Sequence, residues 1–93
     1  MDDILLEALN FNPVAQERSS AGYMINVYEA ELQSQTLTVR PGEWGWKASS
    51  GSYFHETCYL SDAVKELILI LIENRLIAPN DKLMAILTMK KNR

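Results

Sequence analysis

A run of six alternating leucines and isoleucines at residues 67–72 is the strongest feature in the pattern of apolar and polar positions. A membrane-spanning helix needs about 20 apolar residues, so this run is too short to cross a bilayer. Ser61 and Asp62 suit the start of a helix, because serine caps an N-terminus and an acid beside it complements the helix dipole. Pro79 disfavours helical geometry at the residue before it. We therefore predict the main helix over residues 61–77.

The predicted helix carries two apolar stripes. At about 100° per residue, one stripe faces a sheet and consists of Ala63, Val64, Leu67, Ile68 and Leu71. Leu69, Ile72 and Leu76 form a second stripe at i, i+3 and i+7, with Lys65 among the polar residues around it. Burial of each such side chain is worth about 1.5–3 kcal/mol, which is enough to influence association. The second stripe is covered either by the N-terminal or C-terminal segment of the same chain, or by a second molecule.

Residues 23–60 show the alternation and the turn signals of antiparallel strands. The predicted strands are residues 23–32, 36–40, 44–48 and 53–60. Turn residues separate them at 33–35, at Pro41-Gly42 and at 49–52. The expected inward side chains include Leu37, Val39, Phe54, Cys58 and Leu60. Gly45 lies between two tryptophans and marks a bulge or a close backbone approach.

The two ends of the chain are less distinctive. Residues 1–20 read as a helical arm, in which Asn12-Pro13 resembles a fresh N-cap followed by proline at the first helical position. Such a short terminal arm is alternatively partly disordered in isolation. Residues 81–91 fit a short helix or an edge strand, and we favour the helix because of their leucine, methionine, alanine and lysine content.

These elements predict a single α+β domain over residues 1–93. An antiparallel sheet of three to four strands is packed by one long helix, with a helical arm before it and a short helix or strand after it. The hydrophobic fraction of 47% and the net charge of −3 are typical of a soluble globular protein. The single cysteine excludes an internal disulfide, and together with an N-terminus unlike a secretory signal it indicates the cytoplasm.

Charge is distributed unevenly along the chain. Residues 1–33 hold six acids and one base, whereas the last twelve residues hold four bases and no acid. These ends are either solvated faces or parts of an electrostatic contact, such as a head-to-tail contact between subunits. The overall acidity disfavours nucleic acid as the main partner, since phosphate affinity depends on basic contacts. The candidate nucleic-acid contacts are aromatic and basic residues: Arg40, Trp44, Trp46, Lys47, Lys90, Lys91 and Arg93.

The sequence offers little reactive chemistry. His55 and Cys58 are three residues apart on a predicted strand, so they project to opposite faces and form no local dyad. We expect Cys58 to be a buried structural residue. One cysteine and one histidine exclude the usual zinc-binding spacings, and no phosphate-binding or dinucleotide-binding glycine motif is present. We therefore expect no cofactor and no metal. A catalytic function is left open only if a partner protein supplies part of the active site.

The combination of surplus apolar surface and absent catalytic motifs indicates a small cytoplasmic interaction or regulatory protein. We expect it to self-associate, with a dimer favoured, through Leu69, Ile72, Leu76 and their neighbours. The alternative is a nucleic-acid-binding module that uses the aromatic and basic residues of the sheet and the basic tail. A membrane partner is not expected.

Overall fold

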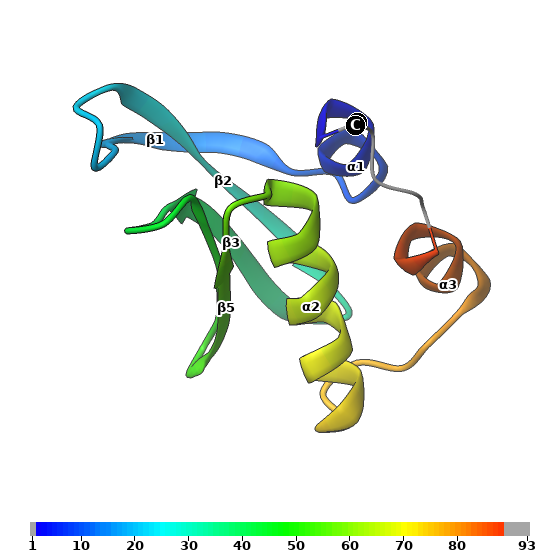
Figure 1. The fold of residues 1–93 in the computed structure, drawn as a ribbon. Coiled ribbons are helices and arrows are strands. Elements are labelled where there is room, and N and C mark those ends of the chain that lie inside the picture. The colour runs from blue at the N-terminus through cyan, green and yellow to red at the C-terminus, as the bar shows by residue number, and fades with distance from the viewer. Residues whose placement is uncertain (1, 89–93) are drawn as a thin grey trace.

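The fold is a five-stranded antiparallel sheet with helices on one face (Figure 1). The computed structural model describes the backbone of residues 2–88 and the side chains of residues 4–88. The elements follow in the order α1 (Asp2–Ala8), β1 (Asn12–Arg18), β2 (Met24–Leu32), β3 (Gln35–Pro41), β4 (Trp46–Ser50), β5 (Tyr53–Thr57), α2 (Leu60–Glu73) and α3 (Asp81–Leu87). The predicted α+β class is confirmed, and the sheet has five strands rather than three or four.

The strands lie in sequence order from β1 to β5, so each pairs with its neighbours in the chain. Short turns make this arrangement possible. Gln33 and Ser34 connect β2 to β3 with φ of 49° and 71°, as a type I′ turn requires. Gly51 begins the two-residue connection from β4 to β5 with a φ of 59°, in the position where a type II′ turn favours glycine. Both turn types match the right-handed twist of the strands that they join.

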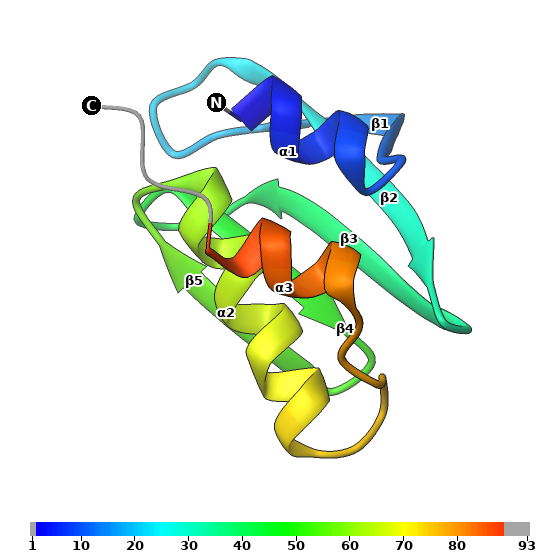
Figure 2. The ribbon, with the colours of Figure 1, turned by 90° about the vertical axis from the view of Figure 1, so that its right-hand side faces the viewer.

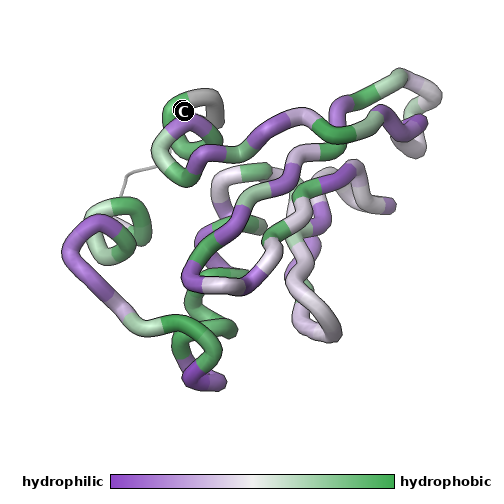
Figure 3. The backbone as a smooth tube through the Cα atoms, turned by 180° about the vertical axis from the view of Figure 1, so that it is seen from behind, coloured by the Kyte–Doolittle hydropathy of each residue, from purple (hydrophilic) through white to green (hydrophobic). Residues whose placement is uncertain are grey.

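The hydrophobic core lies between the sheet and the three helices, which Figure 2 shows together on one side of it. The sheet contributes Ala30, Leu37, Val39 and Ala48. The α2 helix contributes its predicted inner stripe, and Val64, Leu67, Ile68 and Leu71 are fully buried. The other two helices add Leu5, Leu6, Leu83 and Ile86, and Leu9 follows α1 directly. In Figure 3 the strands alternate between hydrophilic and hydrophobic positions, as a sheet with one covered face requires.

The prediction of a helical arm over residues 1–20 is correct only for α1. Asn10 adopts a left-handed φ of 61°, its N–H donates to the Glu7 carbonyl at 3.0 Å, and the Phe11 N–H donates to the Leu6 carbonyl at 2.8 Å. These bonds form a Schellman motif, which ends the helix. Residues 12–18 then form strand β1 against β2, so the predicted N-cap at Asn12 is wrong.

The main helix also ends earlier than predicted. Arg75 has a left-handed φ of 60°, and the Leu76 N–H donates to the Leu71 carbonyl at 2.9 Å. This second Schellman motif ends α2 at Glu73, six residues before Pro79, which was expected to end the helix. Leu76 therefore lies beyond the helix rather than on its last turn.

After α2 the chain forms the short helix α3, as favoured from the sequence. Asn80 caps it, since its side-chain oxygen accepts a hydrogen bond from the Leu83 N–H at 2.8 Å. Residues 89–91 of the predicted C-terminal element lie outside the described residues.

Candidate functional site

The antiparallel order brings three connections to the same end of the sheet. These are the β1–β2 turn at residues 19–23, the β3–β4 turn at residues 42–45 and the β5–α2 junction at residues 58–59. Each carries an aromatic side chain that is mostly exposed: Tyr23 at 72%, Trp44 at 75% and Tyr59 at 62%. We call these three residues the aromatic end. Large exposed aromatic side chains are informative because most of their surface is apolar.

Backbone hydrogen bonds hold the turn that presents Trp44. The Gly42 N–H donates to the Gly45 carbonyl at 2.9 Å, which closes the turn. The Trp44 N–H donates to Oε2 of Glu56 at 3.0 Å, which ties the turn to β5. The indole is therefore exposed while its backbone is fixed on both sides.

Gly45 lets this turn pack directly on the β5–α2 junction. Its φ is +154°, and a Cβ at this position would lie 2.6 Å from the Cα of Cys58 and 2.6 Å from the carbonyl oxygen of Thr57. Both contacts are to backbone rather than to the far end of a flexible side chain, so a side chain here would require the main chain to shift. The close backbone approach predicted from the Trp-Gly-Trp sequence is thus confirmed, and it places Trp44 near the segment that carries Tyr59.

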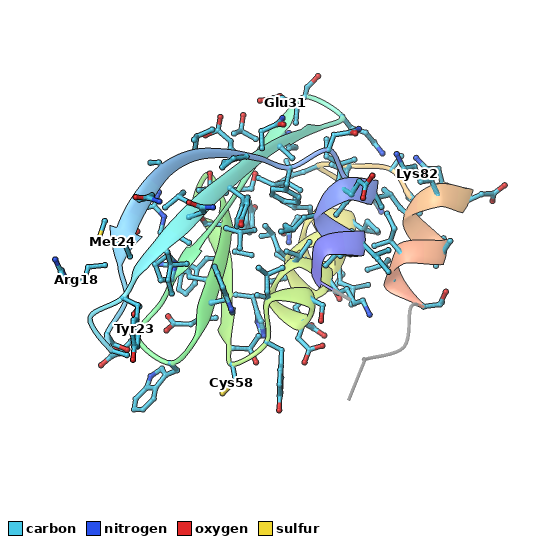
Figure 4. The ribbon with its side chains drawn as sticks, turned by 90° about the horizontal axis from the view of Figure 1, so that it is seen from above. Arg18, Tyr23, Met24, Glu31, Cys58 and Lys82 are labelled. Carbon is cyan, nitrogen blue, oxygen red and sulfur yellow. The ribbon has the colours of Figure 1, made fainter. Side chains whose placement is uncertain are left out.

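The turn that carries Tyr23 is coupled to the Trp44 turn. The Tyr23 N–H donates to the Ser19 hydroxyl oxygen at 3.3 Å, and the Ser19 N–H donates to the Tyr23 carbonyl at 2.8 Å. The Ser20 hydroxyl donates to the Glu43 carbonyl at 3.4 Å, across 23 residues of sequence. Figure 4 shows Tyr23 at the extremity of the molecule, away from Lys82 of α3.

The predicted interaction surface on α2 is smaller than its sequence suggests. Leu69 is 38% exposed and Leu76 is 36% exposed, while Ile72 is half-buried and packs against the core. Ile72 and Leu76 line a shallow pocket of about 470 Å³ together with Gln33 and other residues, whereas Leu69 does not line it. Lys65 is half-buried and is not free of partners.

Among the described residues, the predicted nucleic-acid contacts do not form one surface. Arg40 and Lys47 are direct neighbours on the sheet face away from the helices. Arg40 is paired with Glu17 at 3.2 Å, and the Lys47 ammonium lies 4.5 Å from the centre of the Phe54 ring. Trp46 packs against the core on the opposite face. Lys90, Lys91 and Arg93 lie outside the described residues.

Two predictions about reactive or core residues are wrong. Cys58 is exposed rather than buried, because the chain leaves the sheet after Thr57 and Cys58 precedes α2. Phe54, also expected in the core, is 55% exposed, because its strand position faces away from the helices. Leu60 is buried as expected, but in the first turn of α2.

Further chemistry is limited in the part of the chain that the structure describes. No group of three or more histidine, cysteine, aspartate or glutamate side chains there could hold a metal ion. None of the described helices is long and apolar enough to cross a membrane.

Sequence reasoning missed Tyr23 and Tyr59 as members of an exposed surface. The alternation places both residues in predicted strands, where half of the side chains are expected to be covered. A signal was present for Tyr23, since Gly22 precedes it and glycine favours turns. For Tyr59 the signal was the helix start expected at Ser61. The serine cap itself is wrong, because α2 begins at Leu60 with Tyr59 as its N-cap and Ser61 lies buried in its first turn.

The chain was compared with protein-family models, with curated proteins and with solved structures, and none of the three comparisons found a match.

Proposed function

We propose that this protein is a small non-catalytic module for protein interaction or regulation. The aromatic end is its recognition surface. The observation that carries the proposal is the exposure of Trp44 and Tyr23, at 75% and 72%, on turns whose backbones are hydrogen-bonded. Tryptophan and tyrosine are enriched at protein interfaces and among the residues that dominate binding energy.

The fixed backbone of these turns favours tight binding. Association is opposed by the loss of conformational freedom in both partners. Glu56 and the Gly45 contact already restrict the Trp44 turn, and the Ser20 bond couples it to the Tyr23 turn. A partner would therefore order little beyond the side chains themselves. Each ring brings on the order of 150–250 Å² of surface, enough for the centre of an interface.

The α2 surface offers less to a partner than the aromatic end does. Leu69 and Leu76 are just over one-third exposed, and Ile72 already packs against the core. The nucleic-acid alternative also has less support, because Arg40 is paired with a carboxylate and the chain carries a net charge of −3. Phosphate binding depends on several unopposed basic contacts.

A comparative capture experiment tests the proposal. The tagged wild-type chain, a Y23A/W44A variant and an M84A control serve as bait in extracts of the native cell, with bound proteins quantified by mass spectrometry. Met84 is 47% exposed on α3, away from the aromatic end. We expect the same protein to be enriched by wild type and by M84A, and to be recovered at least tenfold less with Y23A/W44A.

Two results would reject the proposal. One is an equal recovery of every bound protein with all three baits. The other is binding that nuclease treatment abolishes, because it would transfer the function to nucleic acid. Equal far-ultraviolet circular dichroism and equal melting temperatures for the three baits would show that the variants are folded.

A further inference from the structure

The two edges of the sheet are built differently. The β1 edge carries Pro13, which lacks a backbone N–H, and its register with β2 shifts between Pro13 and Ala15. Glu17 and Arg18 add charge at the end of the same strand. Proline, bulges and charges are the means by which proteins prevent an edge strand from pairing with another chain. The β1 edge is therefore protected.

The β5 edge has none of the same backbone protections. Its five residues pair with β4 in an uninterrupted register, from Ser50 with Tyr53 to Trp46 with Thr57. No proline is present, and tyrosine, phenylalanine and threonine all favour strands. Among the described residues no further strand pairs with the outer side of β5. An edge of this kind can accept another strand.

The hairpin geometry identifies the backbone groups that face outward. Ser50 and Tyr53 flank a two-residue turn, and the pair that closes such a turn is of the hydrogen-bonded type. Because hydrogen-bonded and other pairs alternate, Tyr53, His55 and Thr57 direct their backbone groups to β4. Phe54 and Glu56 direct theirs to the free edge.

The side chains of this edge are complementary to a second copy of themselves. On the face away from the helices, the Lys47 ammonium lies 4.5 Å from the centre of the Phe54 ring, and Glu56 follows two residues along the strand. In an antiparallel β5–β5 pair centred on His55, each Phe54 with its lysine lies opposite the Glu56 of the other copy. A centre on Phe54 would move Glu56 away from the Phe54 and Lys47 of the other copy, and a centre on Glu56 would place two carboxylates directly opposite each other. Like charges directly opposite each other destabilise a strand pair.

We infer that two copies of this chain associate through β5, around a two-fold axis at His55, to form one continuous antiparallel sheet. The Phe54 and Glu56 backbone groups of each copy pair with those of the other, and the Lys47 and Glu56 charges select the register. This assembly uses the backbone edge and the outer face of β5, whereas the partner proposed above binds the aromatic rings. The two surfaces share one group, because Oε2 of Glu56 also accepts the hydrogen bond from the Trp44 N–H.

Cysteine cross-linking tests the pairing and its register. At the two-fold axis the two His55 residues form a pair without hydrogen bonds, in which Cα atoms are about 4.5 Å apart, within the range for disulfides. In a C58S background, we expect the H55C variant to form a covalent dimer under mild oxidation. The matched control S49C lies on β4, one strand in from the edge, and Q16C lies on the protected β1 edge. Both controls should stay monomeric.

Solution mass provides the second measurement. We expect wild type to approach twice its 10.6 kDa mass in concentration-dependent light scattering. The F54P variant loses an outward N–H and should shift this equilibrium at least tenfold toward monomer, and H55K should do the same by placing two positive charges at the axis. A mass of 10.6 kDa at every concentration up to the millimolar range would overturn the inference. So would a dimer that persists in both variants, or an H55C chain that cross-links no faster than S49C.

Discussion

The side-chain amide of Gln33 makes two hydrogen bonds to the backbone of Ala78. Nε2 of Gln33 donates to the Ala78 carbonyl oxygen at 2.8 Å, and Oε1 accepts from the Ala78 N–H at 2.7 Å. Gln33 lies in the β2–β3 turn, while Ala78 lies in the segment that connects α2 to α3. The pair therefore fixes the connecting segment two residues before the Asn80 cap, and with it the start of α3.

Removal of this clamp should destabilise the fold. Each hydrogen bond contributes a net 0.5–1.5 kcal/mol, and both bonds are exposed to solvent, so Q33A should lower the free energy of unfolding by about 1–2 kcal/mol. Urea denaturation followed by tryptophan fluorescence measures the change. Q16A is the matched control, since Gln16 makes a single exposed hydrogen bond to Asn26. A Q33A midpoint no lower than that of Q16A would contradict the clamp.

Ser34 should be replaceable by glycine with a gain in stability. Ser34 has a φ of 71° in a turn of type I′, whose second central position favours glycine. Left-handed geometry costs a residue with a Cβ about 1–2 kcal/mol, and part of this gain is offset by the greater freedom of glycine in the unfolded chain. We expect S34G to raise the free energy of unfolding by about 0.5–1 kcal/mol in the same denaturation experiment. A destabilised S34G would mean that the hydroxyl contributes more than the strain costs.

Arg75 presents the same situation at the end of α2. Its φ of 60° places it at the left-handed position of a Schellman motif, where glycine is the most common residue. R75G should stabilise the protein by about 0.5–1 kcal/mol, measured by thermal unfolding. The matched control is N10G at the equivalent position of α1, where the native asparagine already tolerates a φ of 61° and the gain should be smaller.

The main helix and the central strands could be predicted because their signals are local. Residues 67–72 are apolar on every face, and Leu37 and Val39 alternate with polar residues between clear turns. Strand β1 could not be predicted in this way. Asn12-Pro13 has the local chemistry of a helix start, and only its pairing with β2, decided by tertiary structure, makes it a strand.

The candidate site was only partly predictable for the same reason. The sequence identified Trp44 and the close approach at Gly45, but it placed Trp44 within a strand. The exposure of Cys58 depends on where β5 ends and α2 begins, which alternation alone does not fix. No glycine marks the end of α2 at Glu73, so the sequence pattern carries the second apolar stripe on to Leu76, beyond the last residue of the helix.

Acidic substitutions on α2 distinguish the contribution of this helix to stability from its predicted contribution to self-association. Leu69 is 38% exposed, so L69D should cost less than about 1 kcal/mol of stability, as surface substitutions usually do. Ile72 packs against the core, so I72D should cost about 2–4 kcal/mol, because it buries part of a carboxylate. Light scattering of L69D then reports on association alone. If wild type is a dimer, a monomeric L69D would support self-association through α2, whereas an L69D dimer would support the β5 edge.

Gly45 should be the glycine least tolerant of substitution, because its constraint is backbone against backbone. In G45A the new Cβ would meet the Cys58 Cα and the Thr57 carbonyl oxygen, each at 2.6 Å, at a φ of +154°. We expect a loss of more than about 2 kcal/mol, since strain and steric overlap are among the few causes of large single-residue effects. G22A is the control, because Gly22 also has a positive φ, +91°, but nothing lies within 4 Å of its Cβ position. It should lose about 1 kcal/mol from the backbone alone. Equal melting temperatures for G45A and G22A would show that the Trp44 turn does not rest on the β5–α2 junction, and the fixed presentation of Trp44 would then lose its physical basis.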